Sequence, residues 1–123
     1  MPPKRIPEAT GRAAVTAALA PGADRDTTAT AVRYLLQVLA ETAEGNSVEV
    51  RVPPFGAVQA IEGPRHTRGT PPNVVEMDPG TWIALATGRM GWDEAVTAGI
   101  VSASGSRADL REQLPVAWET MNG

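Results

Sequence analysis

A cluster of cationic side chains in a short polar segment is the first candidate for chemistry in this sequence. Arg65, His66 and Arg68 lie within residues 63–73, a stretch that also holds two glycines and three prolines and is therefore predicted to be a loop. Guanidinium groups bind carboxylates and phosphates through paired hydrogen bonds, so this loop is a candidate anion-binding site for a polar head group. The alternative is structural, with the arginines pairing with acidic neighbours and holding the loop in place. Those neighbours are Glu62, Glu76 and Asp78.

The residues that could serve in catalysis do not form a recognisable catalytic pattern. Ser102, Ser104 and Ser106 lack the sequence of a nucleophile elbow, and the last two are explained by a turn and a helix cap. His66 could act as a general base beside a carboxylate, but a single loop histidine between arginines is more typical of surface hydrogen bonding. No glycine-rich phosphate motif with its lysine is present. We therefore predict no catalytic residues and a protein that is not an enzyme.

The composition of the chain excludes several kinds of site and partner. Its 123 residues include no cysteine and one histidine, so thiolate and multi-histidine metal sites are excluded and no metal or cofactor is expected. The net charge of -3 and the pI near 5.1 argue against nucleic-acid binding, which depends on clustered lysine and arginine. No segment approaches the roughly 20 apolar residues of a membrane-spanning helix.

The N-terminal segment has two interpretations. Basic residues precede an apolar run at residues 13–20, as they do in a secretory signal peptide. The run is short and mostly alanine, however, and acidic Glu8 stands in the region that should be purely basic. These features favour an alanine-rich helix over residues 8–20. We therefore expect a cytoplasmic protein in which residues 1–23 form a helical extension of the core.

A long helix followed by two strands is predicted for the next part of the chain. Apolar residues recur at helical spacing through residues 24–44, with Asp26 or Thr27 as the cap. Residues 47–52 alternate between apolar and polar types, and residues 55–61 form a second strand that should pair antiparallel with the first. The helix must bury its apolar stripe against this sheet. The stripe consists of Val32, Leu35, Leu36, Leu39 and Ala43.

The second half of the chain contains short elements in a compact order, within VVEMDPGTWIALATGRMGWDEAVTAGIVSASGSRADLREQLP. Asp78 and Pro79 are a helix cap and a first-turn proline, and Gly88 and Gly99 are helix stops. The resulting prediction is strand, helix, helix, strand, helix. In residue numbers these are a strand at 74–77, a helix from 78 to 88, a helix around 92–96, a strand at 100–103 and a helix from 104–106 to 114–115.

This order of elements resembles the sterol-carrier-protein family. Two sequence segments, VEVRVPPFGAVQ and HTRGTPPNVVE, resemble an actinobacterial branch of that family. The resemblance covers residues 24–118. It implies one α/β (α+β) domain with a mainly antiparallel sheet of four or five strands covered by helices. In that family the sheet and helices enclose an apolar cavity for fatty-acyl or sterol-like ligands. Related domains also occur at the end of mycothiol-dependent maleylpyruvate isomerases, but this chain lacks the metal-binding helical bundle of those enzymes.

Two functions remain open from the sequence. The first is binding of a fatty-acyl or other apolar small molecule in an internal pocket, with the loop of Arg65, His66 and Arg68 on its polar end. The second is a ligand-free interaction module that uses an exposed apolar face around Trp118 and Met121 to join a partner or to form a homodimer. An accessory role in mycothiol-dependent isomerase systems is held in reserve. For the first function, the predicted pocket residues are Leu35, Leu39, Val58, Trp82, Leu85, Trp92, Leu110 and Trp118.

Overall fold

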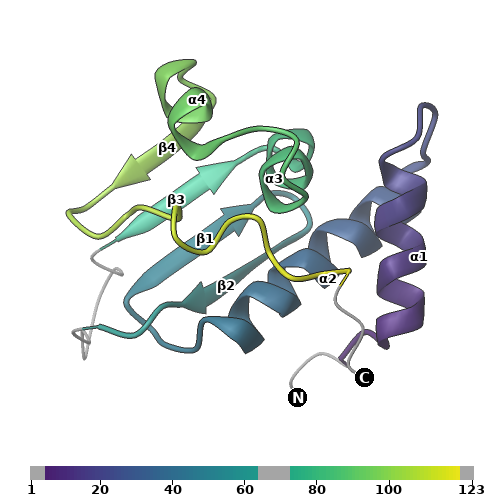
Figure 1. Cartoon of the computed structure of the whole chain (residues 1–123), viewed down its shortest axis with the longest axis horizontal. Coiled ribbons are helices and arrows are strands. Elements are labelled where there is room, and N and C mark those ends of the chain that lie inside the picture. Colours follow the sequence, from purple (N-terminus) through teal and green to yellow (C-terminus); the bar gives the residue numbers. More distant parts are fainter. Residues whose placement is uncertain (1–4, 64–72, 120–123) are drawn as a thin grey trace.

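Four β-strands form one mixed sheet in the computed structural model, which describes residues 5–63 and 73–119 (Figure 1). The sheet has the spatial order β2-β1-β3-β4. β1 pairs antiparallel with β2 and parallel with β3, and β3 pairs antiparallel with β4. The predicted α/β domain with a mainly antiparallel sheet is therefore confirmed, with one parallel pairing at its centre. The strands are β1 (Val48–Val52), β2 (Gly56–Ala60), β3 (Val74–Met77) and β4 (Val101–Ser104).

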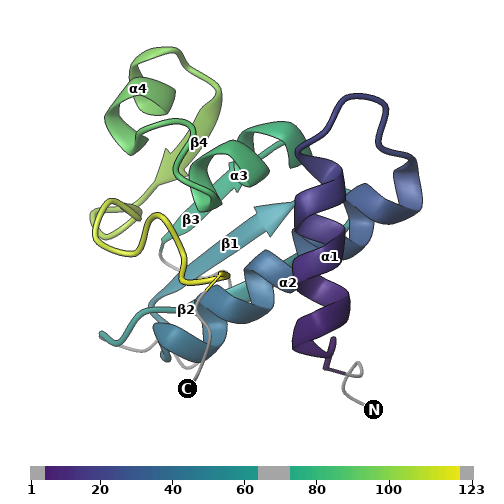
Figure 2. The ribbon, with the colours of Figure 1, turned by 45° about the vertical axis from the view of Figure 1, so that its right-hand side comes forward.

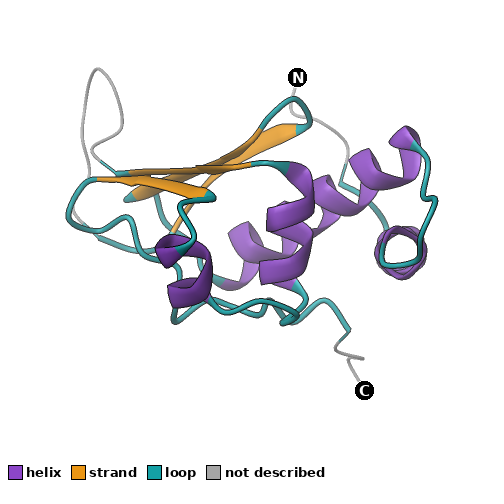
Figure 3. Cartoon of the chain, turned by 90° about the horizontal axis from the view of Figure 1, so that it is seen from above, coloured by secondary structure: helices purple, strands orange, loops and turns teal. Residues whose placement is uncertain are grey.

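The two faces of this sheet differ in chemistry because side chains alternate along each strand. On β1, Val48, Val50 and Val52 point inward and are at most 1% exposed. Glu49 and Arg51 point outward, where Arg51 Nε lies 2.8 Å from Glu49 Oε2. Figure 3 shows the sheet nearly edge-on with the helices on one side only. No helix of the described ranges therefore covers the polar face.

Four helices lie on the apolar side of the sheet, and the longest of them, α2, forms much of the core. Its Leu35 and Leu39 are fully buried. α1 packs against α2 (Figure 2). This contact depends on Gly11, because a Cβ atom there would overlap the Tyr34 ring. The helices are α1 (Glu8–Ala18), α2 (Arg25–Thr42), α3 (Pro79–Ala86) and α4 (Trp92–Thr97).

Aspartate caps begin α2 and α3. The Asp24 carboxylate accepts a hydrogen bond from the Thr27 amide at 2.8 Å, and the Asp78 carboxylate accepts one from the Thr81 amide at 2.7 Å. The predicted start of α3 at Asp78 and Pro79 is confirmed. The predicted cap of α2 at Asp26 or Thr27 is wrong, because Asp24 caps the helix and both predicted residues lie within the first turn. An aspartate in the first turn also suits the helix dipole, so sequence alone does not separate these two positions.

The predicted final helix over residues 104–115 is wrong, because this segment is a series of turns that crosses the apolar side of the sheet (Figure 1). The Asp109 side chain accepts from the Arg111 amide at 2.8 Å, a local hydrogen bond that competes with helix formation. Ala108, Leu110 and Val116 are buried from this irregular backbone. The core contacts of the segment therefore outweigh the weak helical preference of a short sequence.

One corner of the sheet joins three segments that are distant in sequence. The Ser47 amide and hydroxyl both donate to the Ile61 carbonyl oxygen, at 3.1 and 2.6 Å. Asn73 Nδ2 donates to the Ser47 carbonyl oxygen at 2.7 Å, and Asn73 Oδ1 accepts from the Arg107 amide at 2.9 Å. Ser47 and Asn73 are both buried, so these bonds also satisfy polar groups that water does not reach.

Across the described ranges, the structure contains no helix that combines the length and the apolar character needed to cross a membrane.

Candidate functional site

An open groove with a volume of about 960 Å³ runs along α2, between the edge strand β2 and the chain that leads into α1. Two smaller hollows, of about 450 and 250 Å³, lie elsewhere on the molecule. The groove is mostly apolar, with a few charged and amide groups. Its lining residues are Arg5, Ile6, Pro7, Thr10, Thr30, Arg33, Leu36, Gln37, Glu41, Phe55, Gly56, Ala57 and Val58.

The groove exists because two adjacent stripes of side chains on α2 have different neighbours. One packs under the sheet, and the other lines the groove. Thr30, Arg33, Gln37 and Glu41 are spaced by three or four residues and so lie on one side of the helix, beside the stripe that packs under the sheet. Val58 is on the inner face of β2, opposite Val50, but β2 is an edge strand and Val58 stays only half-buried. The edge of the sheet therefore leaves an apolar strip that α2 does not fully cover.

The chain before α1 forms one wall of the groove and is held to α2 by four hydrogen bonds. Arg5 binds both carboxylate oxygens of Glu41, at 2.6 and 2.9 Å. The Ile6 amide donates to Gln37 Oε1 at 2.8 Å, and Gln37 Nε2 donates back to the Ile6 carbonyl oxygen at 2.9 Å. The hydrogen bond from Arg5 lowers the pKa of Glu41, and the same bond raises the pKa of Arg5. This end of the groove is consequently neutral overall.

The opposite end of the groove is formed around the half-buried ring of Phe55, in the turn between β1 and β2. Arg33 Nε donates to the Phe55 carbonyl oxygen at 2.8 Å, and its Cζ lies 5.9 Å from the ring centroid. Arg25 Cζ lies 5.0 Å from the same centroid. Two cationic groups therefore stand over one aromatic ring where the groove meets the beginning of α2.

The structure places most of the predicted pocket residues in the interior and one of them in the groove. Val58 lines the groove. Trp82 donates from its indole nitrogen to the Val32 carbonyl oxygen at 3.3 Å, so both its ring and its polar atom are committed to the core. Trp118 is 9% exposed, also within the core cluster. The fully buried members of the predicted set are Leu35, Leu39, Trp82, Leu85 and Leu110.

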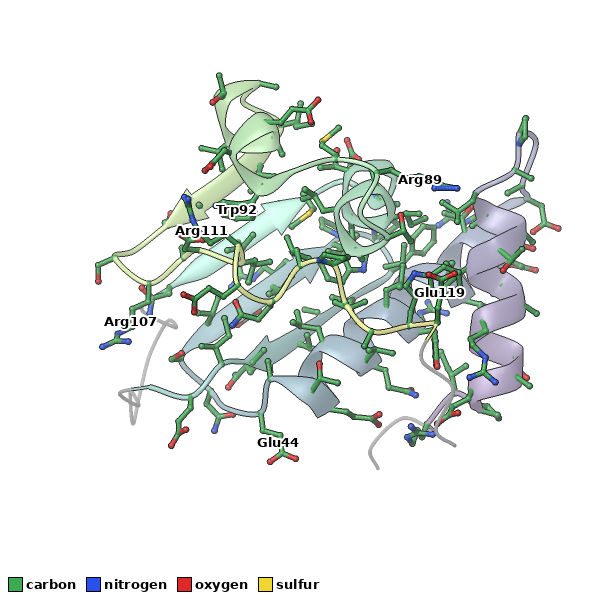
Figure 4. All side chains as sticks on the ribbon, in the orientation of Figure 1. Glu44, Arg89, Trp92, Arg107, Arg111 and Glu119 are labelled. Atoms are coloured by element: carbon green, nitrogen blue, oxygen red, sulfur yellow. The ribbon has the colours of Figure 1, made fainter. Side chains whose placement is uncertain are left out.

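Two predicted pocket residues, Leu85 and Trp92, meet in the hollow of about 450 Å³ beside α4. Arg111 contributes to the same hollow and pairs with Asp93, at 2.9 Å between Arg111 Nη2 and Asp93 Oδ1. Figure 4 shows Trp92 and Arg111 together on the side of the molecule away from α1. The predicted residues are thus divided between the core, this hollow and the groove.

The predicted anion-binding loop lies outside the described residues, so Arg65, His66 and Arg68 stay a prediction. Within the described ranges, no group of three histidine, aspartate or glutamate side chains is arranged to hold a metal ion. Sequence reasoning missed the polar lining residues Arg33, Gln37 and Glu41, because it named only apolar residues of this helix as site residues. A polar stripe beside an apolar one gives no signal that a second segment will fold over it.

A mixed sheet covered on one face by helices, with an apolar groove at its edge, is consistent with a sterol-carrier-like α/β domain. The comparison of families agrees: the chain belongs to the family described as bacterial SCP ortholog, which matches residues 24–116. No curated protein matches the chain. The family match begins at the Asp24 cap of α2, so α1 and the groove wall of Arg5, Ile6 and Pro7 lie before the matched region.

Proposed function

We propose that this protein binds an apolar or acyl small molecule, with the groove along α2 as its site. The observation that carries the proposal is the half-buried Val58 on the inner face of an edge strand, open to about 960 Å³ of mostly apolar space. Sites for small molecules commonly have volumes of about 300 to 1,000 Å³, with apolar walls and a few polar groups that orient the ligand. Membership of a sterol-carrier-like family supports the same class of ligand.

This proposal differs from the internal pocket predicted from the sequence. Leu35, Leu39 and Leu110 are fully buried against protein, so a ligand would reach them only if the core opened. The groove needs no such opening, because it is already open to solvent. We therefore favour the groove over the interior. A cytoplasmic location is part of the proposal.

The competing proposal is an interaction module that joins a partner or a second copy of the chain. The observation in its favour is a pair of exposed apolar side chains, Val96 at 44% and Ile100 at 39% of full exposure, on and after α4. Trp118, which was predicted to contribute to such a face, is buried, and Met121 lies outside the described residues. Sedimentation of the protein with and without ligand separates the two functions. A stable dimer broken by Val96→Asp, with no ligand bound, would favour the module.

The direct test of the groove is titration with decan-1-ol, an uncharged apolar ligand, followed by NMR of labelled methyl groups. We expect saturable shifts at Ile6, Leu36 and Val58. The methyl groups of Leu39 and Leu110, which are fully buried and line none of the three hollows, serve as the internal reference. Shifts confined to the core residues would contradict the groove and favour the interior pocket.

A matched pair of variants on one strand makes this test sharper. Val58→Trp fills the groove, whereas Gln59→Trp places the same side chain on the opposite, exposed face of β2. We expect the first variant to lose decanol binding and the second to retain it. Equal binding by both variants would show that the ligand lies elsewhere.

A further inference from the structure

Arg33 and Arg25 give one end of the groove a positive charge, and no carboxylate among the described residues forms an ion pair with either of them. Arg33 lines the groove, and its Nε is occupied by the Phe55 carbonyl oxygen at 2.8 Å. Its two terminal nitrogens have no acceptor among the residues that the structure describes. Arg25 lies about two helical turns earlier on α2. Both side chains are exposed and share the ring of Phe55, at 5.0 and 5.9 Å from its centroid.

Four other arginines of the described chain are neutralised by nearby carboxylates. Arg5, Arg12, Arg51 and Arg111 each have a carboxylate partner, at distances between 2.6 and 3.4 Å. Within the described ranges, Arg33 has no such partner. The groove thus has a neutral end at the Arg5 ion pair and a cationic end at Arg33, with an apolar stretch between them.

We propose that Arg33, assisted by Arg25, binds the anionic head group of a single-chain amphiphile whose tail lies in the groove against Leu36, Val58 and Ile6. The inference rests on the proposed function and adds the chemical class of the ligand, a carboxylate or phosphate monoester on an unbranched chain. Arg33 and Glu41 are eight residues apart on α2, which corresponds to about 12 Å along the helix. A chain of medium length fits that span, and the guanidinium fork suits both kinds of head group.

The experiment compares ligands that differ only in the head group. Decanoate, decyl phosphate and decan-1-ol are titrated at pH 7.5, below micelle-forming concentrations, into the wild type and into Arg33→Gln, Arg33→Lys and Arg89→Gln. Arg89 is an exposed arginine near the end of α3, outside the groove lining, and serves as the control (Figure 4). Inorganic phosphate and acetate are titrated alone to detect a site that binds only the head group.

We expect the wild type to bind the two anions about fivefold more tightly than the alcohol, the preference that one partly exposed ion pair supplies. Within Arg33→Gln, the two anions should bind no more tightly than decanol, whereas Arg33→Lys should restore part of the preference and Arg89→Gln should keep it all. Rising salt should weaken only the anions.

Each other result overturns the inference in a distinguishable way. Equal affinity for the anions and the alcohol in the wild type overturns the head-group site and leaves the apolar groove standing. Binding of inorganic phosphate as tight as that of decyl phosphate shows a site for a free anion rather than an amphiphile. Absence of all binding, alcohol included, overturns the proposed function together with the inference.

Discussion

Two neighbouring stripes of α2 lie in different environments, although both are parts of one regular helix. The stripe of Leu35 and Leu39 is sealed under the sheet, at 0% exposure. The stripe of Arg33 and Gln37 faces the groove, where it meets the edge of the sheet on one side and the N-terminal chain on the other. The first is held by apolar burial and the second by specific hydrogen bonds. Stability and ligand binding should therefore be separable by mutation along a single helix.

The largest effects on stability should come from the sealed stripe. Leu35→Ala and Leu39→Ala each remove a fully buried side chain and leave a cavity, so we expect each to lower the free energy of unfolding by about 2 to 5 kcal/mol. Thr30→Ala, on the groove stripe, should change it by less than about 0.5 kcal/mol. Denaturant unfolding measures all three. Similar midpoints for Leu35→Ala and Thr30→Ala would remove the distinction between the two stripes.

The next effect concerns the packing of α1 on α2. In Gly11→Ala the new Cβ atom would overlap the Tyr34 ring, and we expect a loss of about 1 to 3 kcal/mol as the helices move apart. Gly80→Ala is the matched control, because its Cβ would meet only the Asp78 carboxylate oxygen at 3.6 Å and alanine is the better helix former. The two variants should therefore shift thermal unfolding in opposite directions. A shift of the same sign in both would contradict the close α1–α2 contact.

Smaller effects are expected at the helix caps. Asp78→Ala removes the acceptor for the Thr81 amide and should lower the free energy of unfolding by about 1 kcal/mol. Asp78→Asn keeps a capping oxygen and should retain most of the free energy of unfolding that Asp78→Ala loses. Asp26→Ala tests the alternative cap of α2 and should matter little, because the Thr27 amide bonds to Asp24. A loss in Asp26→Ala as large as that in Asp78→Ala would reverse the assignment of that cap.

The smallest effect on stability should come from the contact between Arg5 and Glu41 in the groove wall. NMR signals of neighbouring residues are the best measure of it. The pKa of Glu41 is lowered in the folded protein, so the Arg5 contact stabilises the fold above the ordinary glutamate pKa and is lost as pH falls through the lowered value. We expect the Ile6 and Gln37 NMR signals to shift together over that acidic range, while the Leu39 signals do not. In Glu41→Gln this titration should disappear. Signals that titrate unchanged in the variant would assign the effect to another group.

The elements that sequence predicted well are those specified by neighbouring residues. β3 and the start of α3 follow from an apolar run, an aspartate cap and a proline within six residues, and the structure confirms them. The family resemblance, and with it the sterol-carrier-like fold, is confirmed over residues 24–116. Local patterns and family membership therefore predicted the scaffold.

The groove and the last segment were not predictable by the same reasoning, because distant contacts determine both. The Arg5 to Glu41 pair joins residues 36 apart in sequence, and nothing in either neighbourhood indicates the other. A serine cap at residues 104–106 and a stop at Leu114–Pro115 predicted a helix there. Leu110 is instead fully buried in the core cluster from a series of turns, so tertiary packing decided the backbone of this segment.

The corner at Ser47 also fixes the positions of two described flanks, Ile61 and Asn73, relative to each other. Both flanks are anchored to the same serine, through the Ile61 carbonyl oxygen on one side and the Asn73 side chain on the other. The ends are thus brought together by the sheet itself, and the entropy of closing a longer connection rises only slowly with its length. A foreign peptide or reporter placed between the flanks should leave the strand register intact.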